Sequence, residues 1–295
     1  MDFLVVVGLL SFFVLLGGVF AQSNYSDSYY SDSDSSFDQN YYITWGNDHV
    51  RSLNEGREIQ LSMDRSSGSG FGSKLNYGSG FFHSRLKIPG KDSAGVITAF
   101  YLSSQDNYGH DELDLEFLGN TEGKPITLQT NVFVDGVGGR EQRIYLWFDP
   151  TSNFHTYKIL WNPFQIVFYV EDIPIRVLKN NRNVGIGYPS HPMQMQASLW
   201  NGDWATDGGR TKINWAFAPF KANFQEFDIS GCPSQTSNID PECYSSNYWW
   251  NTNEYWNLNS TQQRQYEKVR KNYMYYDYCT DRDRYPTPPP ECFYV

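Results

Sequence analysis

Between about Ile43 and Phe227 the chain is a succession of short runs in which apolar and polar residues alternate, separated by Gly, Asn, Asp and Pro. The runs include "REIQLSMD", "AGVITAFYLSS", "ITLQTNVFVDG", "HTYKILWNP" and "PMQMQASLWNG". A period of two is typical of strands, because successive side chains point to opposite faces of a sheet. No amphipathic helix of useful length interrupts the runs, which excludes a fold of alternating strands and helices. Many short strands at this spacing predict an all-β sandwich or jelly roll.

One helix is predicted near the end of the chain, in "NSTQQRQYEKVRKNYMYYDYC". Ser260 and Gln263 have the spacing of a capping box, and Tyr266, Val269 and Tyr273 share a face at helical period. The tail "DRDRYPTPPPEC" cannot continue a helix, so it is expected to run extended.

The N-terminus indicates export. An apolar stretch, "FLVVVGLLSFFVLLGGVF", ends in small residues at the usual cleavage spacing, which predicts a signal peptide over residues 1–21. The stretch has no basic residue before it and lies near the length that spans a bilayer, so an uncleaved anchor is the alternative. Residues 22–38 are rich in Ser, Tyr and Asp and are predicted to be a disordered spacer. N-glycosylation sequons begin at Asn24 and Asn259.

The four cysteines lie in the last quarter of the chain, Cys232 near Cys243 and Cys279 near Cys292. In an oxidising compartment two local bridges are the simplest pairing, although the sequence alone allows three pairings. No CxxC motif is present, so neither a metal ribbon nor a redox pair is expected.

The stretch "HDELDLEF", residues 110–117, lines one side of a short segment with carboxylates. On a strand its side chains divide between a core face, with Leu113, Leu115 and Phe117, and an outward face, with His110, Glu112, Asp114 and Glu116. Like charges on one face repel each other, so the pattern costs stability and indicates a function. A calcium site and simple surface acidity are the alternatives.

Paired carboxylates suit glycoside hydrolysis or transfer, which needs a nucleophile and an acid that retaining enzymes hold about 5–5.5 Å apart. The Cα atoms of Glu112 and Glu116 are expected about 13 Å apart on a flat strand. Two side chains that lean together by roughly 4 Å each would close this distance. Asp114, between them, can hydrogen-bond to Glu112, and coupling among the three is expected to raise the pKa of one glutamate and leave the other ionised. The spacing does not say which glutamate is which.

The signature "HDELDLEFLGN" resembles that of plant xyloglucan endotransglucosylase/hydrolases in glycoside hydrolase family 16. The resemblance continues through "LQTNVF", "GGREQRIYLWFDPT", "PIR", "SLWNGDWATDGGRTKINW" and "NYMYYDYCTDRDRYP", and it covers nearly everything from about Tyr42 to Cys292. It implies a concanavalin A-like jelly-roll catalytic domain over residues 39–228. It also implies a disulfide-stapled C-terminal extension over residues 229–295 that contains the one helix, with bridges Cys232–Cys243 and Cys279–Cys292.

The resemblance also implies roles for single residues on the concave face of the jelly roll. Glu112 would be the nucleophile, Asp114 its helper and Glu116 the acid/base. Substrate-binding roles are implied for Glu116, Gln129, Asn131, Arg140, Glu141, Asp203, Trp204, Gly208 and Arg284. Tryptophan rings stack on sugar rings, and the polar groups hydrogen-bond to hydroxyls. Taken alone, Trp204 would be interpreted as core packing and Arg140 as part of a surface ion pair.

The activity implied is that of a retaining enzyme, secreted to the cell wall and apoplast, that cleaves the xyloglucan backbone through a glycosyl-enzyme. The acceptor is another xyloglucan chain or an oligosaccharide. Because "VFVDGVGGREQ" lacks the loop insertion of the family's hydrolytic branch, transfer is expected to dominate. A mainly hydrolytic endo-xyloglucanase, a wall glucan-binding protein without turnover, and mixed-linkage glucan or cellulose as donors remain alternatives.

No cofactor and no metal are expected, and the protein is expected to be a monomer without a membrane partner once the signal is cleaved. The formal net charge is −10 and no long Lys/Arg run is present, which excludes a typical nucleic-acid binder.

Overall fold

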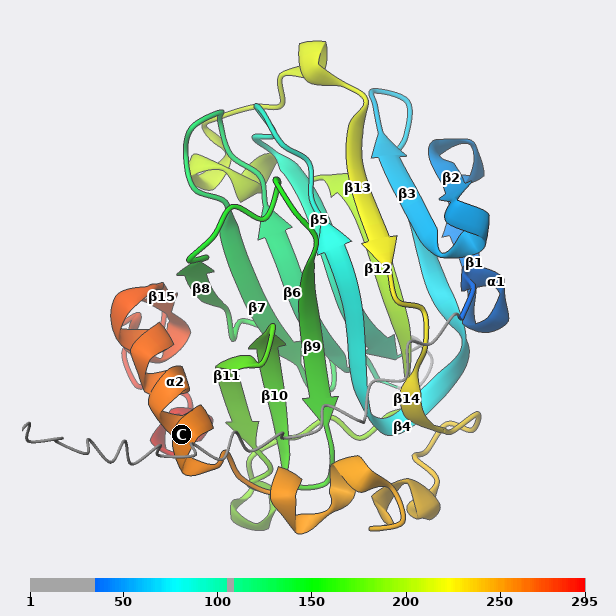
Figure 1. The fold of residues 1–295 in the computed structure, drawn as a ribbon. Helices are drawn as coiled ribbons and strands as arrows, with labels where there is room; N and C mark the ends of the chain where they lie inside the picture. The colour runs from blue at the N-terminus through cyan, green and yellow to red at the C-terminus, as the bar shows by residue number, and fades with distance from the viewer. Residues whose placement is uncertain (1–34, 105–108, 295) are drawn as a thin grey trace, which may run out of the picture. The chain divides into compact units, whose positions relative to one another are not determined.

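The computed structural model of the protein describes residues 35–104 and 109–294, which belong to one compact unit (Figure 1). The predicted signal peptide or anchor over residues 1–21 and the sequon at Asn24 lie outside the described residues. In the ranges that are described, no helix has both the length and the apolar character needed to cross a bilayer.

The described residues form fifteen strands, and every pairing between them is antiparallel. One layer holds β1 (Tyr41–Trp45), β12 (Met193–Asn201), β5 (Val96–Ser104), β6 (Glu112–Leu118), β7 (Thr127–Phe133), β8 (Gln142–Tyr145) and β15 (Met274–Asp277). The other layer holds β2 (Val50–Leu53), β3 (Glu58–Met63), β13 (Phe220–Gln225), β9 (His155–Trp161), β10 (Gln165–Val170) and β11 (Ile173–Lys179). In Figure 1, β9 and β10 lie in front of the layer that contains β5, β6 and β7. The predicted all-β jelly-roll sandwich is confirmed.

The long strand β4 (Ser69–Lys87) belongs to both layers. Its first half pairs with β1 and β12, and its second half pairs with β9 and β13, while β14 (Ser230–Pro233) pairs near its middle. One continuous strand therefore links the two sheets across the core.

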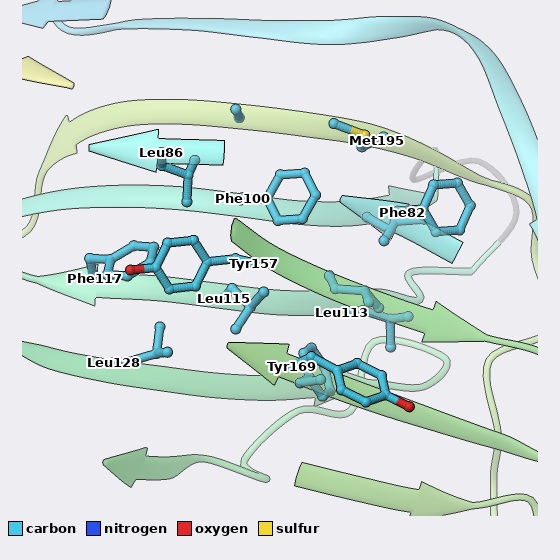
Figure 2. Close-up of a cluster of buried hydrophobic side chains, with 14 of the residues drawn as sticks. Phe82, Leu86, Phe100, Leu113, Leu115, Phe117, Leu128, Tyr157, Tyr169 and Met195 are labelled. Atoms are coloured by element: carbon cyan, nitrogen blue, oxygen red, sulfur yellow. The ribbon is translucent and has the colours of Figure 1, made fainter. Parts of the chain in front are cut away.

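The core lies between the two layers (Figure 2). Leu113, Leu115 and Phe117 point from β6 into this space, as the alternation of the sequence predicts, and none is more than 1% exposed. The ring of Phe117 packs edge-on against Tyr157 of β9, with 4.7 Å between centroids. Each such side chain contributes about 1.5–3 kcal/mol by leaving water, so the register of β6 is strongly determined.

A short helix, α1 (Phe37–Asn40), begins inside the predicted disordered spacer. Phe37 is buried, and its ring packs edge-on against Phe71 and Phe227 at 5.2 and 5.3 Å. The prediction of disorder is therefore wrong for the last residues of the spacer, because an aromatic side chain that enters the core offsets the entropy of ordering them.

The C-terminal region contains the predicted helix, α2 (Ser260–Asn272), with Tyr266 and Val269 on its buried face. The predicted capping box is wrong by one residue. Asn259 is the N-cap, its side chain accepts from the backbone N–H of Gln262, and the Gln262 side chain accepts from the backbone N–H of Asn259. Asparagine suits this position as well as serine does, because its side-chain oxygen reaches the free N–H groups of the first turn.

Both predicted bridges, Cys232–Cys243 and Cys279–Cys292, are present. The second bridge closes the segment that follows β15, and β15 itself pairs with β8. The C-terminal residues thereby extend the layer that carries β6.

Candidate active site

Three carboxylates stand in line along the outward side of β6. Glu112, Asp114 and Glu116 alternate with three apolar residues that belong to the core. Because β6 pairs along its whole length with β5 on one side and β7 on the other, its side chains cannot rotate to the opposite surface. The predicted alternation is confirmed. We call the surface formed by the outward side chains of β12, β5, β6, β7, β8 and β15 the carboxylate face.

Asp114 is the most buried of the three carboxylates, with 6% of its surface exposed. Burial raises its pKa well above the usual range, and the charges of Glu112 and Glu116 and a hydrogen bond with Glu112 raise it further. The positive charge of Arg176 acts in the opposite direction. Asp114 therefore favours a protonated carboxyl that can donate a hydrogen bond to Glu112.

Glu116 also has a raised pKa, first because it is buried and then because Glu112 and Glu141 carry like charges. A hydrogen bond of 2.7 Å from Nε2 of Gln129 and the charge of Arg143 partly offset this rise. A carboxyl that keeps its proton above the usual pKa of glutamate can act as a general acid toward a bound substrate.

Gln129 is itself held in place by Arg143, whose Nε donates to its carbonyl oxygen at 2.7 Å. The guanidinium of Arg143 lies over the ring of Tyr276, 5.0 Å from the centroid. Arg143 and Tyr276 were missed in the sequence analysis. Arg143 lies two positions after Glu141, so the alternation of β8 places it on the carboxylate face, but only the pairing of β7 with β8 brings it to Gln129.

At the other end of the row, Oε2 of Glu112 lies 3.4 Å from Nε2 of His110. Phe133, which is paired with Glu112 across β6 and β7, packs edge-on against the imidazole at 5.4 Å. The predicted placement of His110 on the same side as the carboxylates is confirmed.

Tyr101 is another residue of the carboxylate face that the sequence analysis missed. It pairs with Asp114 across β5 and β6, and its hydroxyl donates to Oε1 of Gln196 at 3.1 Å. Burial, followed by the negative charges of Glu112 and Asp114, raises its pKa, so the phenol stays protonated beside the carboxylates.

The predicted residues of the "QTN" and "GRE" motifs lie in one region, but they have different partners. The side-chain oxygen of Asn131 accepts from the backbone N–H of Arg140 at 3.0 Å, which joins β7 to the following loop. The guanidinium of Arg140 bonds to Glu291 at 2.6 Å and to backbone carbonyls. Glu141 pairs with Arg284 at 2.6 Å. Of the two arginines, Arg284 is the more accessible, with 42% of its side chain exposed.

The "DWATDGG" loop lies at the Glu116 end of β6. The hydroxyl of Thr206 donates to the carbonyl of Gly119, just after β6, and accepts from the backbone N–H of Gly95, just before β5. Trp204, whose ring lies 6.3 Å from that of Trp200, keeps 44% of its surface exposed rather than packing in the core.

The other two predicted residues of this loop have local roles. Asp203 pairs with Lys212 at 3.0 Å on the surface. Gly208 has a φ of 61°, in the left-handed region that glycine adopts without strain.

A separate group of possible metal ligands consists of Asp111, Asp135 and His191. Asp111 is fully buried. Its oxygens accept from the backbone N–H groups of Asp135, Ser190 and His191. Oδ2 also lies 2.9 Å from Nδ1 of the His191 ring. These bonds already satisfy the carboxylate, so its role is to join three loops at the Glu112 end of β6.

Comparison with family models assigns most of the chain. Residues 37–217 match the model described as "Glycosyl hydrolases family 16", and residues 244–292 match that described as "Xyloglucan endo-transglycosylase (XET) C-terminus". The carboxylate row of β6 lies within the first match, and α2 and β15 lie within the second.

Two relatives from Arabidopsis thaliana are similar over most of their length. "Xyloglucan endotransglucosylase/hydrolase protein 2" is 61% identical over 258 residues, which cover 87% of this chain and 88% of the relative. "Putative xyloglucan endotransglucosylase/hydrolase protein 1" is 55% identical over 99% of this chain and 98% of its own. Among solved structures, a Bacillus licheniformis β-glucanase superposes with a TM-score of 0.53 at 24% identity, covering 63% of this chain and 89% of that chain, which shows a common fold.

Proposed function

The chain belongs to the xyloglucan endotransglucosylase/hydrolases of glycosyl hydrolases family 16, and from this membership we propose that it cleaves the β-1,4-glucan backbone of xyloglucan and joins the cut chain to another. The observation that carries the proposal is the row on β6, where Glu116, with its raised pKa and its bond from Gln129, faces the same way as Glu112. An acid and a second carboxylate on one face are what a retaining mechanism needs.

In the first step, Glu112 attacks the anomeric carbon of the donor while Glu116 gives its proton to the departing glycosidic oxygen. The bond between the sugar and the leaving chain breaks, and an ester between the sugar and Glu112 forms. Asp114 donates a hydrogen bond to Glu112, which keeps that carboxylate oriented and lowers the cost of three adjacent negative charges.

In the second step, the carboxylate of Glu116 takes a proton from the 4-hydroxyl of an acceptor chain, whose oxygen then attacks the ester and restores the original anomeric configuration. Water competes for the same intermediate at roughly 55 M, so transfer dominates only if the acceptor is held in reactive geometry. We assign the holding of the acceptor to the C-terminal residues near Glu116, because β15 and Arg284 extend the carboxylate face beyond β8 and Glu141.

The proposed contacts to sugar are those implied by the family motifs: Glu116, Gln129, Asn131, Arg140, Glu141, Asp203, Trp204, Gly208 and Arg284. Among these, the exposed ring of Trp204 and the accessible guanidinium of Arg284 are the best supported. The side chain of Arg140 is turned toward Glu291 in this structure, so its contribution would be to fix the loop that carries Glu141.

We also propose where the protein acts and how its chain is divided into domains. The catalytic domain would span residues 39–228 and the extension residues 229–295, and the protein would act outside the cell, in the cell wall and apoplast, on xyloglucan donors and on xyloglucan or oligosaccharide acceptors.

The test is to incubate the purified protein with xyloglucan and fluorescently labelled xyloglucan oligosaccharides. Transfer moves label into polymer, whereas hydrolysis produces new reducing ends without label. Glu112→Gln should abolish both while leaving polysaccharide binding intact, and Glu122→Gln, at an exposed position after β6, should change neither. Reducing ends that accumulate without incorporated label would overturn the transfer assignment.

A further inference from the structure

Trp45 is an exposed aromatic residue on the opposite side of β6 from the C-terminal extension. It is the last residue of β1, and 39% of its surface is exposed. β1 pairs with β4, whereas β15 pairs with β8, so the two strands lie beyond opposite ends of the series β12, β5, β6 and β7 (Figure 1). The sugar contacts proposed above include no residue of β1 or β4.

Strand pairing connects Glu116 to Gly70 of β4 through two residues on the strands between them. Glu116 pairs with Ala99 of β5, and Ala99 pairs with Ser198 of β12. Ser198 in turn pairs with Gly70. Residues directly opposite each other in antiparallel strands point to the same side of the sheet, so the position at Gly70 faces the same way as the carboxylate of Glu116.

The indole of Trp45 lies over Gly70 on this face. A Cβ on Gly70 would overlap Nε1 of the indole, and a Cβ on Gly68 would come within 3.1 Å of Cη2 of the same ring. The register of β1 against β4 shifts between Ile43 and Trp45, and such a bulge changes the direction of the side chain that follows it. The missing side chains of the two glycines thus make room for the ring on the carboxylate face.

The residues between Glu116 and the indole have short side chains. We call Ala99, Ser198 and Gly70 the donor row. Tyr101 follows Ala99 by two positions and Trp200 follows Ser198 by two, and because β5 and β12 are antiparallel these longer side chains stand on opposite sides of the row. A sugar chain can therefore come close to the backbone of the sheet along the donor row, with a glycine at its far end.

The donor row also has a length that fits the substrate. Three strand spacings of about 4.8 Å separate β6 from β4, or about 14 Å in total, and a β-1,4-linked glucosyl residue is about as long as one spacing. An acceptor bound over β8 and β15 leaves the opposite side of β6 for the donor. A glucan chain that crosses the sheet there would reach the exposed ring of Trp45 at about its third residue from the cleaved bond.

We propose that Trp45 binds the donor: its ring stacks on the glucan backbone of xyloglucan, about three residues from the cleaved bond, in the part of the chain that becomes attached to Glu112. Aromatic rings suit this task because they present a flat apolar surface to a sugar ring. The inference rests on the proposed function, and it deepens that function by assigning a residue to the donor half of the site.

The experiment measures label transfer with the concentrations of xyloglucan and of labelled oligosaccharide varied separately. Because the reaction passes through a covalent intermediate, kcat/KM for the donor reports the first step and kcat/KM for the acceptor reports the second. Trp45→Ala should lower kcat/KM for the donor about tenfold and leave kcat/KM for the acceptor within about twofold. Trp45→Phe, which keeps an aromatic ring, should recover most of the donor value.

Gly70→Ala provides a second variant in which the indole is displaced but not removed, and it tests the inference if Trp45→Ala fails to fold. It should also lower kcat/KM for the donor selectively, and combining it with Trp45→Ala should cause little further loss, because both changes remove the same contact.

Trp249→Ala is the matched control. Trp249 is 38% exposed, and its ring packs against Phe81 in the second half of β4, at 5.3 Å. Its replacement should leave kcat/KM for the donor within twofold. Folded Trp45→Ala and Gly70→Ala variants with an unchanged donor value, or with equal losses for donor and acceptor, would overturn the inference. A wild-type protein without turnover would instead overturn the proposed function.

Discussion

Gln129 donates a 2.7 Å hydrogen bond from its side-chain nitrogen to Oε2 of Glu116. The orientation of the Gln129 amide is determined, because Arg143, which can only donate, binds the amide oxygen and leaves the nitrogen to Glu116. The bond favours the ionised form of Glu116, whereas burial favours the protonated form. The balance of the two leaves Glu116 able to release and recover a proton within one reaction cycle.

Replacing Gln129 by leucine removes the bond that lowers the Glu116 pKa, so this pKa should rise further. We expect the high-pH limb of kcat/KM to move upward and kcat/KM at neutral pH to fall at least tenfold, since a sugar contact is lost as well. The measurement is the pH profile of label transfer, with Gln235→Leu on the exposed surface as the control. An unchanged high-pH limb would show that Gln129 acts only on the substrate.

Asp114→Asn should make the protein more stable and less active. In the unfolded chain Asp titrates near 3.9, whereas burial raises its pKa in the folded protein. The stability contributed by this group is therefore full below about pH 4 and is lost as the pH rises through the folded pKa.

Asparagine does not titrate, so Asp114→Asn should raise the free energy of unfolding at pH 7 by roughly 1 kcal/mol or more, with little effect near pH 3. Urea denaturation at both pH values measures this, and Asp283→Asn, at an exposed position, should show no such difference. A loss of stability at pH 7 would mean that ionised Asp114 is the favoured form.

The sandwich and its register could be predicted from the sequence because alternation is a local property of each strand. Leu113, Leu115 and Phe117 can be assigned to the core face of their strand without knowing which strands pair with it. The prediction of disorder failed where a local pattern fits both a disordered segment and an ordered one. Phe37 follows a polar tract, and only its contacts with Phe71 and Phe227 reveal that it is buried.

The site was only partly predictable for a related reason. The three carboxylates of β6 lie within one short segment of the sequence, so the alternation of that segment reveals them. Arg143 and Tyr101 contact the site through neighbours that are set by strand pairing, and a pattern within one segment does not carry that information.

The N-cap of α2 can be tested by two adjacent substitutions. Asn259→Ala removes the acceptor of two backbone N–H groups and should cost about 1 kcal/mol of stability. Ser260→Ala, at the first helical position, should cost less than half as much. Thermal unfolding of protein made without glycosylation separates the cap from the sequon, and Thr261→Ala, which removes the sequon but keeps the cap, is the control. Equal losses for Asn259→Ala and Ser260→Ala would contradict the assignment.

Trp204 and Trp256 offer a matched pair, because they are 44% and 42% exposed but lie in different parts of the molecule. Trp204 is on the loop that Thr206 ties to the end of β6, whereas Trp256 stacks on Phe164 at 4.4 Å, beside β10. If Trp204 stacks on a sugar, Trp204→Ala should lower kcat/KM about tenfold, or about 1.4 kcal/mol, with little change in stability.

Trp256→Ala should do the reverse, lowering the melting temperature by the loss of its stacking while leaving kcat/KM within twofold. Transfer kinetics and thermal unfolding, measured on the same preparations, distinguish the two residues. If both substitutions reduced activity equally, exposure of an aromatic ring would not by itself identify a sugar contact here, and the assignment of Trp204 would fail. If only Trp204→Ala did so, the ring would act as a platform at the Glu116 end of the carboxylate face.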